Sequence, residues 1–181
     1  YTTSDPASWA AFNTLGGTAA IRHYSLNEDV MTNTSDEHVL GYFVSDVELA
    51  GPYSMMPEAR ALAFGNPCYF GYLSSNNFTR GFPQYARAFN ANYLALPALS
   101  ASTVAGAASD SEVVVRRIDT TSDGTWIAII NIGMDDKIGV TVTLPVSGTV
   151  TNGVTGSAVS TSGNQITMDL YPAQLVTLRI Q

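Results

Sequence analysis

Residues 112–132 read EVVVRRIDTTSDGTWIAIINI, two apolar runs separated by a polar turn. Successive side chains of a β-strand point to opposite faces of the sheet. Val113 and Val115 therefore share one face of the first strand, and Val114 and Arg116 share the other. The stretch predicts a β-hairpin that organises the remainder of the chain.

The turn of this hairpin contains Asp123 and Gly124, and glycine tolerates the positive φ angle that tight turns require. The return strand, residues 125–131, places Trp126 on one face and Ile127 on the other, and the apolar pattern continues along both faces. A strand that is apolar on both faces is buried on both sides. We therefore expect it to lie in the centre of a sheet.

Three further alternations of apolar and polar residues follow, at 140–144, 166–170 and 176–180, and clusters of Gly, Asn, Asp and Ser separate them. Short strands with turns every 8–12 residues are typical of an antiparallel β-sandwich. We predict such a sandwich over residues 111–181. Five of its side chains are expected to be buried: Trp126, Ile129, Val142, Met168 and Leu178.

The sequence before residue 100 has a different pattern. Strand-like stretches at 18–26, 39–44 and 68–73 alternate with helical spacing at 55–63 and 82–96. Alternating strands and helices predict an α/β segment. Three parallel strands cannot close a barrel of eight, so we expect this segment to be part of a TIM-barrel-like domain that continues outside the chain.

Local signals place the helix ends and the domain boundaries. Ser54 is the expected N-cap of the first of these two helices, Pro57 is tolerated because it falls in the first turn, and Gly65-Asn66-Pro67 ends the helix. The small, polar residues near position 100 predict a boundary. The domains that we predict are 1–100, the C-terminal part of an α/β catalytic domain; 101–110, a linker; and 111–181, the β-sandwich.

Composition limits the classes of partner. The chain of 181 residues is 45% apolar and 13% charged, enough apolar residues for sizeable cores. Its net charge of −7 argues against a nucleic-acid partner, and no apolar run reaches the roughly 18 residues of a membrane span. Few lysines and the sequons at Asn33 and Asn77 suit a secreted protein. The single Cys68 excludes an intrachain disulfide and is expected to be a buried structural residue.

Acidic side chains follow two of the strand-like stretches. Asp46 and Glu48 lie two positions apart at the end of the second stretch, so their side chains point to the same side, about 7 Å apart along the backbone. Glu28 follows the first stretch. Two carboxylates, one protonated and one ionised, are what glycoside hydrolysis requires, so these three are the predicted catalytic residues. The competing interpretation is that Asp46 or Glu48 stabilises the N-terminus of the following helix.

Polar-tipped side chains accompany these carboxylates in the sequence. Arg22, His23, Tyr42 and Tyr72 lie on the three strand-like stretches, and aromatic faces stack on sugar rings, so we predict that they shape a substrate site. Aromatic residues in strands are also common in protein cores, and that alternative stays open. The sequence has no phosphate-binding glycine loop and no metal-ligand spacing, so we predict neither a cofactor nor a metal.

The strand sequences VVVRRID, WIAIINIG, VTVTLP and YPAQLVTLRI are similar to terminal β-domains that follow the catalytic barrels of amylase-like and α-galactosidase-like enzymes. Asn27-Glu28 also resembles the Asn-Glu acid/base signature of the large clan of retaining glycosidases. The resemblance implies that the chain is the C-terminal portion of a glycoside hydrolase. It also implies a carbohydrate substrate, and the N-terminal remainder of the same enzyme as a partner.

A second interpretation is a non-catalytic carbohydrate-binding or structural module, in which the acidic residues have no chemical role. The upstream reading frame separates the two. Some 200 or more upstream residues with repeating strands and helices would favour the enzyme, because a barrel of eight strand-helix units typically needs about 250 residues. An upstream stop codon or an unrelated linker would favour the module.

Overall fold

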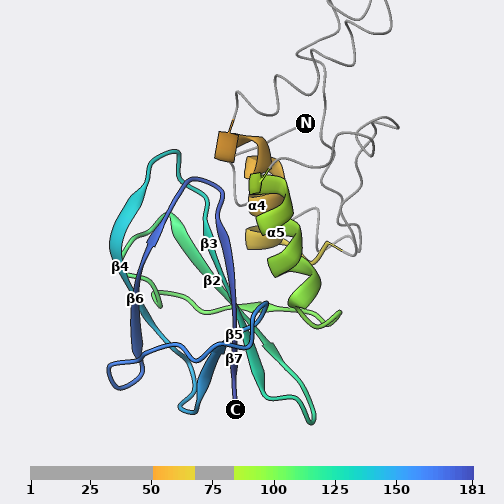
Figure 1. Ribbon diagram of the computed structural model, residues 1–181, viewed down its shortest axis with the longest axis vertical. Coiled ribbons are helices and arrows are strands. Elements are labelled where there is room, and N and C mark those ends of the chain that lie inside the picture. Colours follow the sequence, from red (N-terminus) through yellow and green to blue (C-terminus); the bar gives the residue numbers. More distant parts are fainter. Residues whose placement is uncertain (1–50, 68–83) are drawn as a thin grey trace, which may run out of the picture.

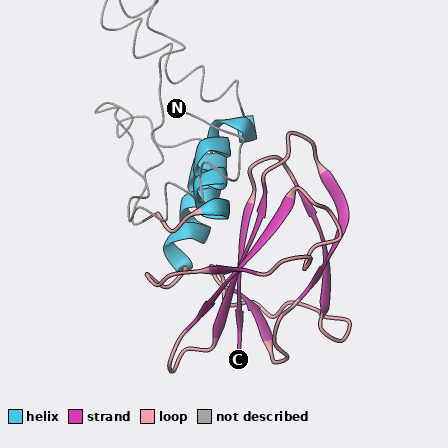
Figure 2. Ribbon diagram, turned by 180° about the vertical axis from the view of Figure 1, so that it is seen from behind, coloured by secondary structure: helices cyan, strands magenta, loops and turns pink. Residues whose placement is uncertain are grey.

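The computed structural model describes residues 51–67 and 84–181. These residues form three layers, visible in Figures 1 and 2: a pair of helices, a five-stranded sheet and a two-stranded sheet. The helices cover one face of the larger sheet, and the two-stranded sheet covers the other. The C-terminus lies at the end of the molecule away from the helices.

The helical layer consists of a 3-10 turn η2 (Gly51–Met55), which leads directly into α4 (Met56–Phe64), and of α5 (Gln84–Ala95). Pro57 lies in the first turn of α4, and the helix ends at an extended Gly65, as the sequence predicts. The prediction for Ser54 is wrong. The N-cap of α4 is Met55, which makes no side-chain capping hydrogen bond, and Ser54 is buried within η2 because the chain approaches α4 through a 3-10 turn.

The larger sheet has the strand order β1-β2-β3-β7-β5, and each of its neighbouring pairs is antiparallel. The strands run over Ser102–Thr103 (β1), Val113–Asp119 (β2), Thr125–Asn131 (β3), Leu175–Ile180 (β7) and Val150–Asn152 (β5). The predicted hairpin is β2–β3. β3 lies between β2 and β7, which confirms the central position expected from its two apolar faces.

The smaller sheet pairs β4 (Lys137–Thr143) with β6 (Gln165–Leu170), also antiparallel. It packs on the inner face of the larger sheet around an aliphatic core. The predicted antiparallel sandwich is therefore confirmed. Of the five side chains expected to be buried, Ile129, Val142 and Leu178 lie in this core, Trp126 is buried on the outer face of β3, and Met168 is partly exposed. Met168 still packs against the inner core.

The outer face of the larger sheet forms a second core with the helices. Ala128 and Ile130 of β3 and Leu175 of β7 are buried against η2, α4 and α5, including Leu62 and Phe89. The sheet is thus buried on both faces. Removing water from this second apolar surface stabilises the packing of the helices on the sandwich.

The loop of the β2–β3 hairpin spans residues 120–124 and returns closely past the C-terminal strand. Gly124 has φ of +77°, and a Cβ there would lie 2.3 Å from the carbonyl oxygen of Ile180. A side chain at this position would therefore collide with the backbone of β7. The glycine expected from turn chemistry is also required by this close approach.

Residues 101–110, the predicted linker, run along the sandwich. Ser102 and Thr103 pair with β2, and Ala107 is buried in the inner core. The proposed division into domains stays a prediction. The strand-like stretches at 18–26, 39–44 and 68–73, and with them the barrel-like segment, lie outside the described residues. Within the described ranges, no helix has the length and hydropathy needed to cross a membrane.

Candidate functional site

The predicted site residues lie outside the described residues. This holds for Asp46, Glu48 and Glu28, the candidate catalytic carboxylates. It also holds for the four predicted substrate-binding residues, which are Arg22, His23, Tyr42 and Tyr72. Their positions relative to one another are not tested, and their roles stay predictions.

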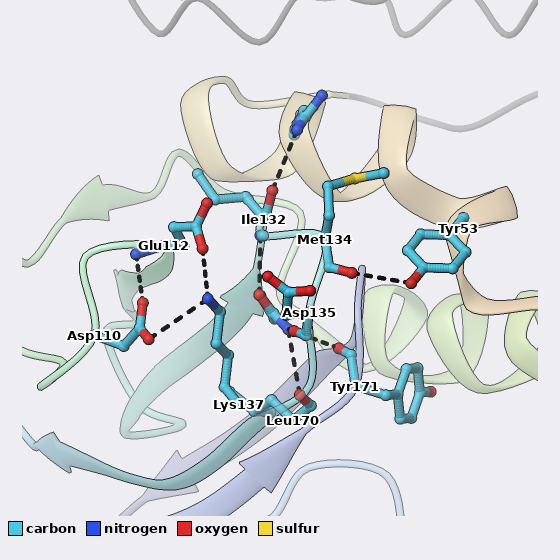
Figure 3. A network of polar contacts seen from close by, with 12 residues as sticks. Tyr53, Asp110, Glu112, Ile132, Met134, Asp135, Lys137, Leu170 and Tyr171 are labelled. Carbon is cyan, nitrogen blue, oxygen red and sulfur yellow. Dashed lines mark hydrogen bonds and ion pairs between the residues drawn. The ribbon is translucent and has the colours of Figure 1, made fainter.

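Among the described residues, polar contacts concentrate where the helical layer meets the connection between β3 and β4 (Figure 3). The hydroxyl of Tyr53, in η2, donates a hydrogen bond of 2.9 Å to the carbonyl oxygen of Met134. The guanidinium of Arg60, in α4, donates a longer one of 3.4 Å to the carbonyl oxygen of Ile132. Two side chains of the helices therefore hold the backbone of this connection.

Asn131, at the end of β3, holds the same connection from inside the sandwich. Its side chain is fully buried, and Nδ2 donates to the carbonyl oxygens of Asp135, Leu170 and Tyr171 at 3.0–3.2 Å. Its Oδ1 accepts a hydrogen bond of 2.9 Å from the backbone N–H of Gly133. One buried amide thus joins the β3–β4 connection to the end of β6.

Lys137, at the start of β4, forms ion pairs with two carboxylates of the segment that precedes β2. Its Nζ contacts Glu112 and lies 3.6 Å from Asp110. The hydrogen bond with Glu112 raises the pKa of Lys137. A Cβ at Gly133 would lie 2.6 Å from a carboxylate oxygen of Glu112, so this position accepts only glycine without displacing that side chain. Asp110 and Glu112 both pair with the ammonium group of Lys137. This pairing suits an anchor for the β3–β4 connection better than a role in proton transfer.

A second polar cluster lies at the opposite end of β3. Arg179 pairs with Asp123 and lies over the ring of Trp126, 5.6 Å from its centroid. The indole N–H of Trp126 donates to Asp123 at 3.3 Å. The Trp126 side chain is buried, with 9% of the residue exposed, so its ring offers no free face on which a sugar could stack.

The electrostatics of Asp119 do not suit a general acid. Hydrogen bonds from Arg117 and Thr125 hold the pKa of this carboxyl below its usual value. It therefore stays ionised at neutral pH, whereas a glycosidase acid must keep its proton.

Tyr171, whose pKa is raised by burial, packs edge-to-face on Tyr85 with ring centroids 5.2 Å apart. Within residues 51–67 and 84–181, no three His, Cys, Asp or Glu side chains group to hold a metal ion.

The residues that organise this junction were not singled out from the sequence. Asn131 carried a signal, because it is the polar position on the face of β3 that otherwise holds Ile127 and Ile129. A buried polar side chain on an apolar face must find hydrogen-bond partners. Tyr53 and Lys137 carried no comparable signal, since their partners lie far away along the sequence.

Comparison with known proteins finds no matching family model and no matching curated protein. Among solved structures, AmyP in complex with maltose and a variant of AmyP in complex with maltotriose each align with 45% of this chain, at 17% identity and a TM-score of 0.36. A candidate α-galactosidase/melibiase from Bacteroides fragilis aligns with 40% of the chain, at 17% identity and a TM-score of 0.34.

The aligned part amounts to 16% of the length of each of these proteins. Each alignment therefore covers less than half of this chain and a small part of the other protein. The similarity identifies no family.

Proposed function

We propose that this chain is the C-terminal portion of a glycoside hydrolase that acts on a polysaccharide or oligosaccharide. Residues up to about 100 belong to its α/β, barrel-like catalytic domain, and the sandwich that follows is its terminal β-domain. In this proposal Asp46 and Glu48 carry the acid/base or nucleophilic chemistry, with Glu28 as partner. Arg22, His23, Tyr42 and Tyr72 contact the sugar.

The observation that carries the proposal is the continuous core between the helices and the outer face of the sandwich. Phe89 of α5 and Leu62 of α4 are buried against Ile130 and Leu175. Few contacts cross the boundary of a module that a flexible linker tethers, and such a module moves independently unless its interface is large and hydrophobic. Here the face is completed by helices of the segment that the sequence assigns to the catalytic domain.

Hydrogen bonds reinforce this integration. The backbone N–H of Thr177, in β7, donates to the side-chain oxygen of Asn92, in α5, at 2.8 Å. The Thr177 hydroxyl donates to the Asn92 carbonyl oxygen, also at 2.8 Å. β5 pairs with β7 from Leu178 to Ile180, and the N–H of Gly153 donates to the Thr177 carbonyl oxygen at 2.8 Å. The Asn92 side chain supplies the acceptor for the remaining Thr177 N–H at this edge of the sheet. A helix that covers a sheet edge in this way favours an integral terminal domain over a separate module.

The substrate class and location follow from the same proposal. Paired carboxylates hydrolyse a glycosidic bond with water as the second substrate, so the chemistry needs no cofactor. Secretion fits the low lysine content and the sequons at Asn33 and Asn77. The partner that we propose is the N-terminal remainder of the same enzyme.

The test is hydrolysis by the complete enzyme of a panel of aryl glycosides and soluble polysaccharides, with the variants Asp46→Asn and Glu48→Gln. If either carboxylate is the general acid, base or nucleophile, its variant should lose about 10²–10⁴-fold in kcat while its Tm stays close to that of the wild type. Asp119→Asn is the matched control, because this carboxylate is exposed, ionised and part of the sandwich.

Two results would contradict the proposal at different levels. Wild-type turnover in both variants would remove Asp46 and Glu48 from the mechanism and leave the enzyme class standing. An absence of hydrolysis on every glycoside, together with binding of a polysaccharide by the intact chain, would establish the non-catalytic alternative.

A further inference from the structure

Arg116 is a buried cation that lies in a strand of the sandwich, but its guanidinium contacts the end of helix α4. It lies in the middle of β2 and is 4% exposed. Its Nη1 donates to the carbonyl oxygen of Ala63 at 2.9 Å and more weakly to that of Leu62 at 3.4 Å. Its Nη2 donates to the carbonyl oxygen of Ala101 at 2.7 Å and to Oδ1 of Asn66 at 3.1 Å.

These acceptors surround the point at which the chain leaves α4. The last carbonyl oxygens of a helix have no partner within the helix, and they form the negative end of its dipole. The guanidinium satisfies two such carbonyls of α4 and places a positive charge at that end. A planar fork with several donors suits this task better than an ammonium group would.

Two further contacts hold the same exit. The side-chain oxygen of Asn66 also accepts a hydrogen bond of 2.9 Å from the backbone N–H of Ala101. The hydroxyl of Tyr93, in α5, donates to the carbonyl oxygen of Pro67 at 2.6 Å. The exit of α4, residues 62–67, is therefore fixed by β2, by the segment before β1 and by α5.

Burial of Arg116 carries a cost that its surroundings must offset. Removal from water lowers the pKa of Arg116, but an arginine side chain remains protonated in proteins. Within the described residues no carboxylate forms an ion pair with it, and its Nε has no hydrogen-bond partner. The buried positive charge of Arg116 therefore interacts with the C-terminal end of α4 and with the carbonyl oxygens that it contacts.

We propose that Arg116 is a positioning residue, through which the sandwich fixes the direction in which the chain leaves α4 at Pro67. The chain continues from there into residues 68–73, the third strand-like stretch of the α/β segment. In the enzyme, Arg116 would act on turnover without touching the substrate. That consequence rests on the proposed function, whereas the positioning of the α4 exit does not.

The experiment compares Arg116→Met with Arg117→Met in the complete enzyme. Arg117 is the adjacent arginine of the same strand, and it points to the other face, where it forms a surface ion pair with Asp119. Hydrogen exchange of the amides in residues 61–66 reports on the α4 exit, and exchange in β3 and β7 reports on the sandwich. The parameters kcat and KM are measured well below the unfolding temperature.

In Arg116→Met we expect exchange in residues 61–66 to accelerate about tenfold, with exchange in β3 and β7 unchanged, because only the local unit loses its partner. We expect kcat to fall by about 10–100-fold with KM little changed, as for a small misplacement of groups remote from the substrate. Arg116→Lys, which can reach one carbonyl oxygen but not the whole set, should give intermediate values. Arg117→Met should match the wild type.

Two outcomes overturn the proposal: unchanged exchange in residues 61–66, or faster exchange throughout the sandwich strands, which would mark Arg116 as a general stability residue. Faster local exchange with wild-type kcat in an active enzyme would overturn the effect on turnover. If the enzyme hydrolyses no glycoside, the proposed function fails, and the exchange pattern alone decides the positioning. If Arg116→Met does not fold, Asn66→Ala removes the acceptor shared with Ala101 and is measured in the same way.

Discussion

The two faces of the five-stranded sheet are buried by different means. The inner face packs on β4 and β6 through aliphatic side chains such as Ile129, Val142 and Leu178. The outer face packs on α4 and α5 through a second apolar core, and it also contains the buried polar residues Arg116 and Thr177. Along most of its length the inner face relies on close apolar packing, with a buried polar anchor, Asn131, at its end. The outer face also needs helices that present matching carbonyl oxygens to Arg116 and a matching amide to Thr177.

The largest expected effects test whether both faces belong to one folding unit. Ile129 and Ile130 are adjacent in β3, both are fully buried, and they point to the inner and the outer face. Replacing either by alanine removes three buried carbons and leaves a cavity, so each variant should lose about 2–5 kcal/mol of unfolding free energy. Urea unfolding of the intact chain, followed by circular dichroism, measures both values. A negligible loss for Ile130→Ala beside a large loss for Ile129→Ala would show that the helical layer contributes little.

The next effect concerns the buried amide at the end of the inner face. Asn131→Ala removes the donor to three carbonyl oxygens and the acceptor for the Gly133 N–H. Leaving buried groups of this kind unpaired costs about 1–3 kcal/mol, so we expect a loss of this size, with faster hydrogen exchange at residues 132–136. Asn152→Ala is the control, because that asparagine caps an exposed turn. Equal exchange at residues 132–136 in Asn131→Ala and the wild type would contradict the anchoring role.

A similar or somewhat smaller effect is expected for the polar pair of the outer face. Asn92→Ala leaves the Thr177 N–H without its acceptor, and Thr177→Val removes the hydroxyl that donates to Asn92. Each variant should lose about 1–2 kcal/mol, because each removes one of the two hydrogen bonds and leaves a buried group unpaired. Urea unfolding of the two single variants measures the losses. Stabilities equal to that of the wild type in both variants would mean that these hydrogen bonds do not hold α5 on the sheet.

The smallest effect is expected at the surface pair of Arg117 and Asp119. Asp119→Asn should change the unfolding free energy at pH 7 by at most about 1 kcal/mol, because exposed ion pairs contribute little. The pKa of Asp119 is lowered by folding, so its contribution is present above the unfolded value of 3.8 and is lost as the pH falls through the lowered pKa.

The predicted direction of this pH dependence can be measured. The Tm of the wild type should fall more steeply below pH 3.8 than the Tm of Asp119→Asn, and the two curves should run parallel above it. Parallel curves over the whole range would show that Asp119 gains no stabilising partner on folding. Because Arg116 makes no ion pair with a described carboxylate, its variants should show no such acid-dependent difference.

The features of the fold that could be predicted from the sequence are those encoded within a few residues. The alternation of β2 and β3 predicted which side chains share a face, and the two apolar faces of β3 predicted its central position. Gly65 predicted where α4 ends, and Pro57 lies in its first turn, the place where the sequence allows a proline. Strand period and backbone restrictions depend on neighbouring residues, so they can be read directly from the chain. The predicted site at Asp46, Glu48 and Glu28 rests on the same kind of reasoning and stays a prediction.

Only the tertiary structure decided which element completes each face. The sequence places Arg116 and Arg117 on opposite faces, but the burial of Arg116 depends on α4, more than 50 positions earlier, whereas Arg117 stays partly exposed. Thr177 meets Asn92 across 85 positions, and Tyr53 meets Met134 across 81. Ser54 has the chemistry of a cap and is buried instead, because a 3-10 turn leads into α4. Contacts of this range depend on the packing of whole elements, which no local pattern encodes.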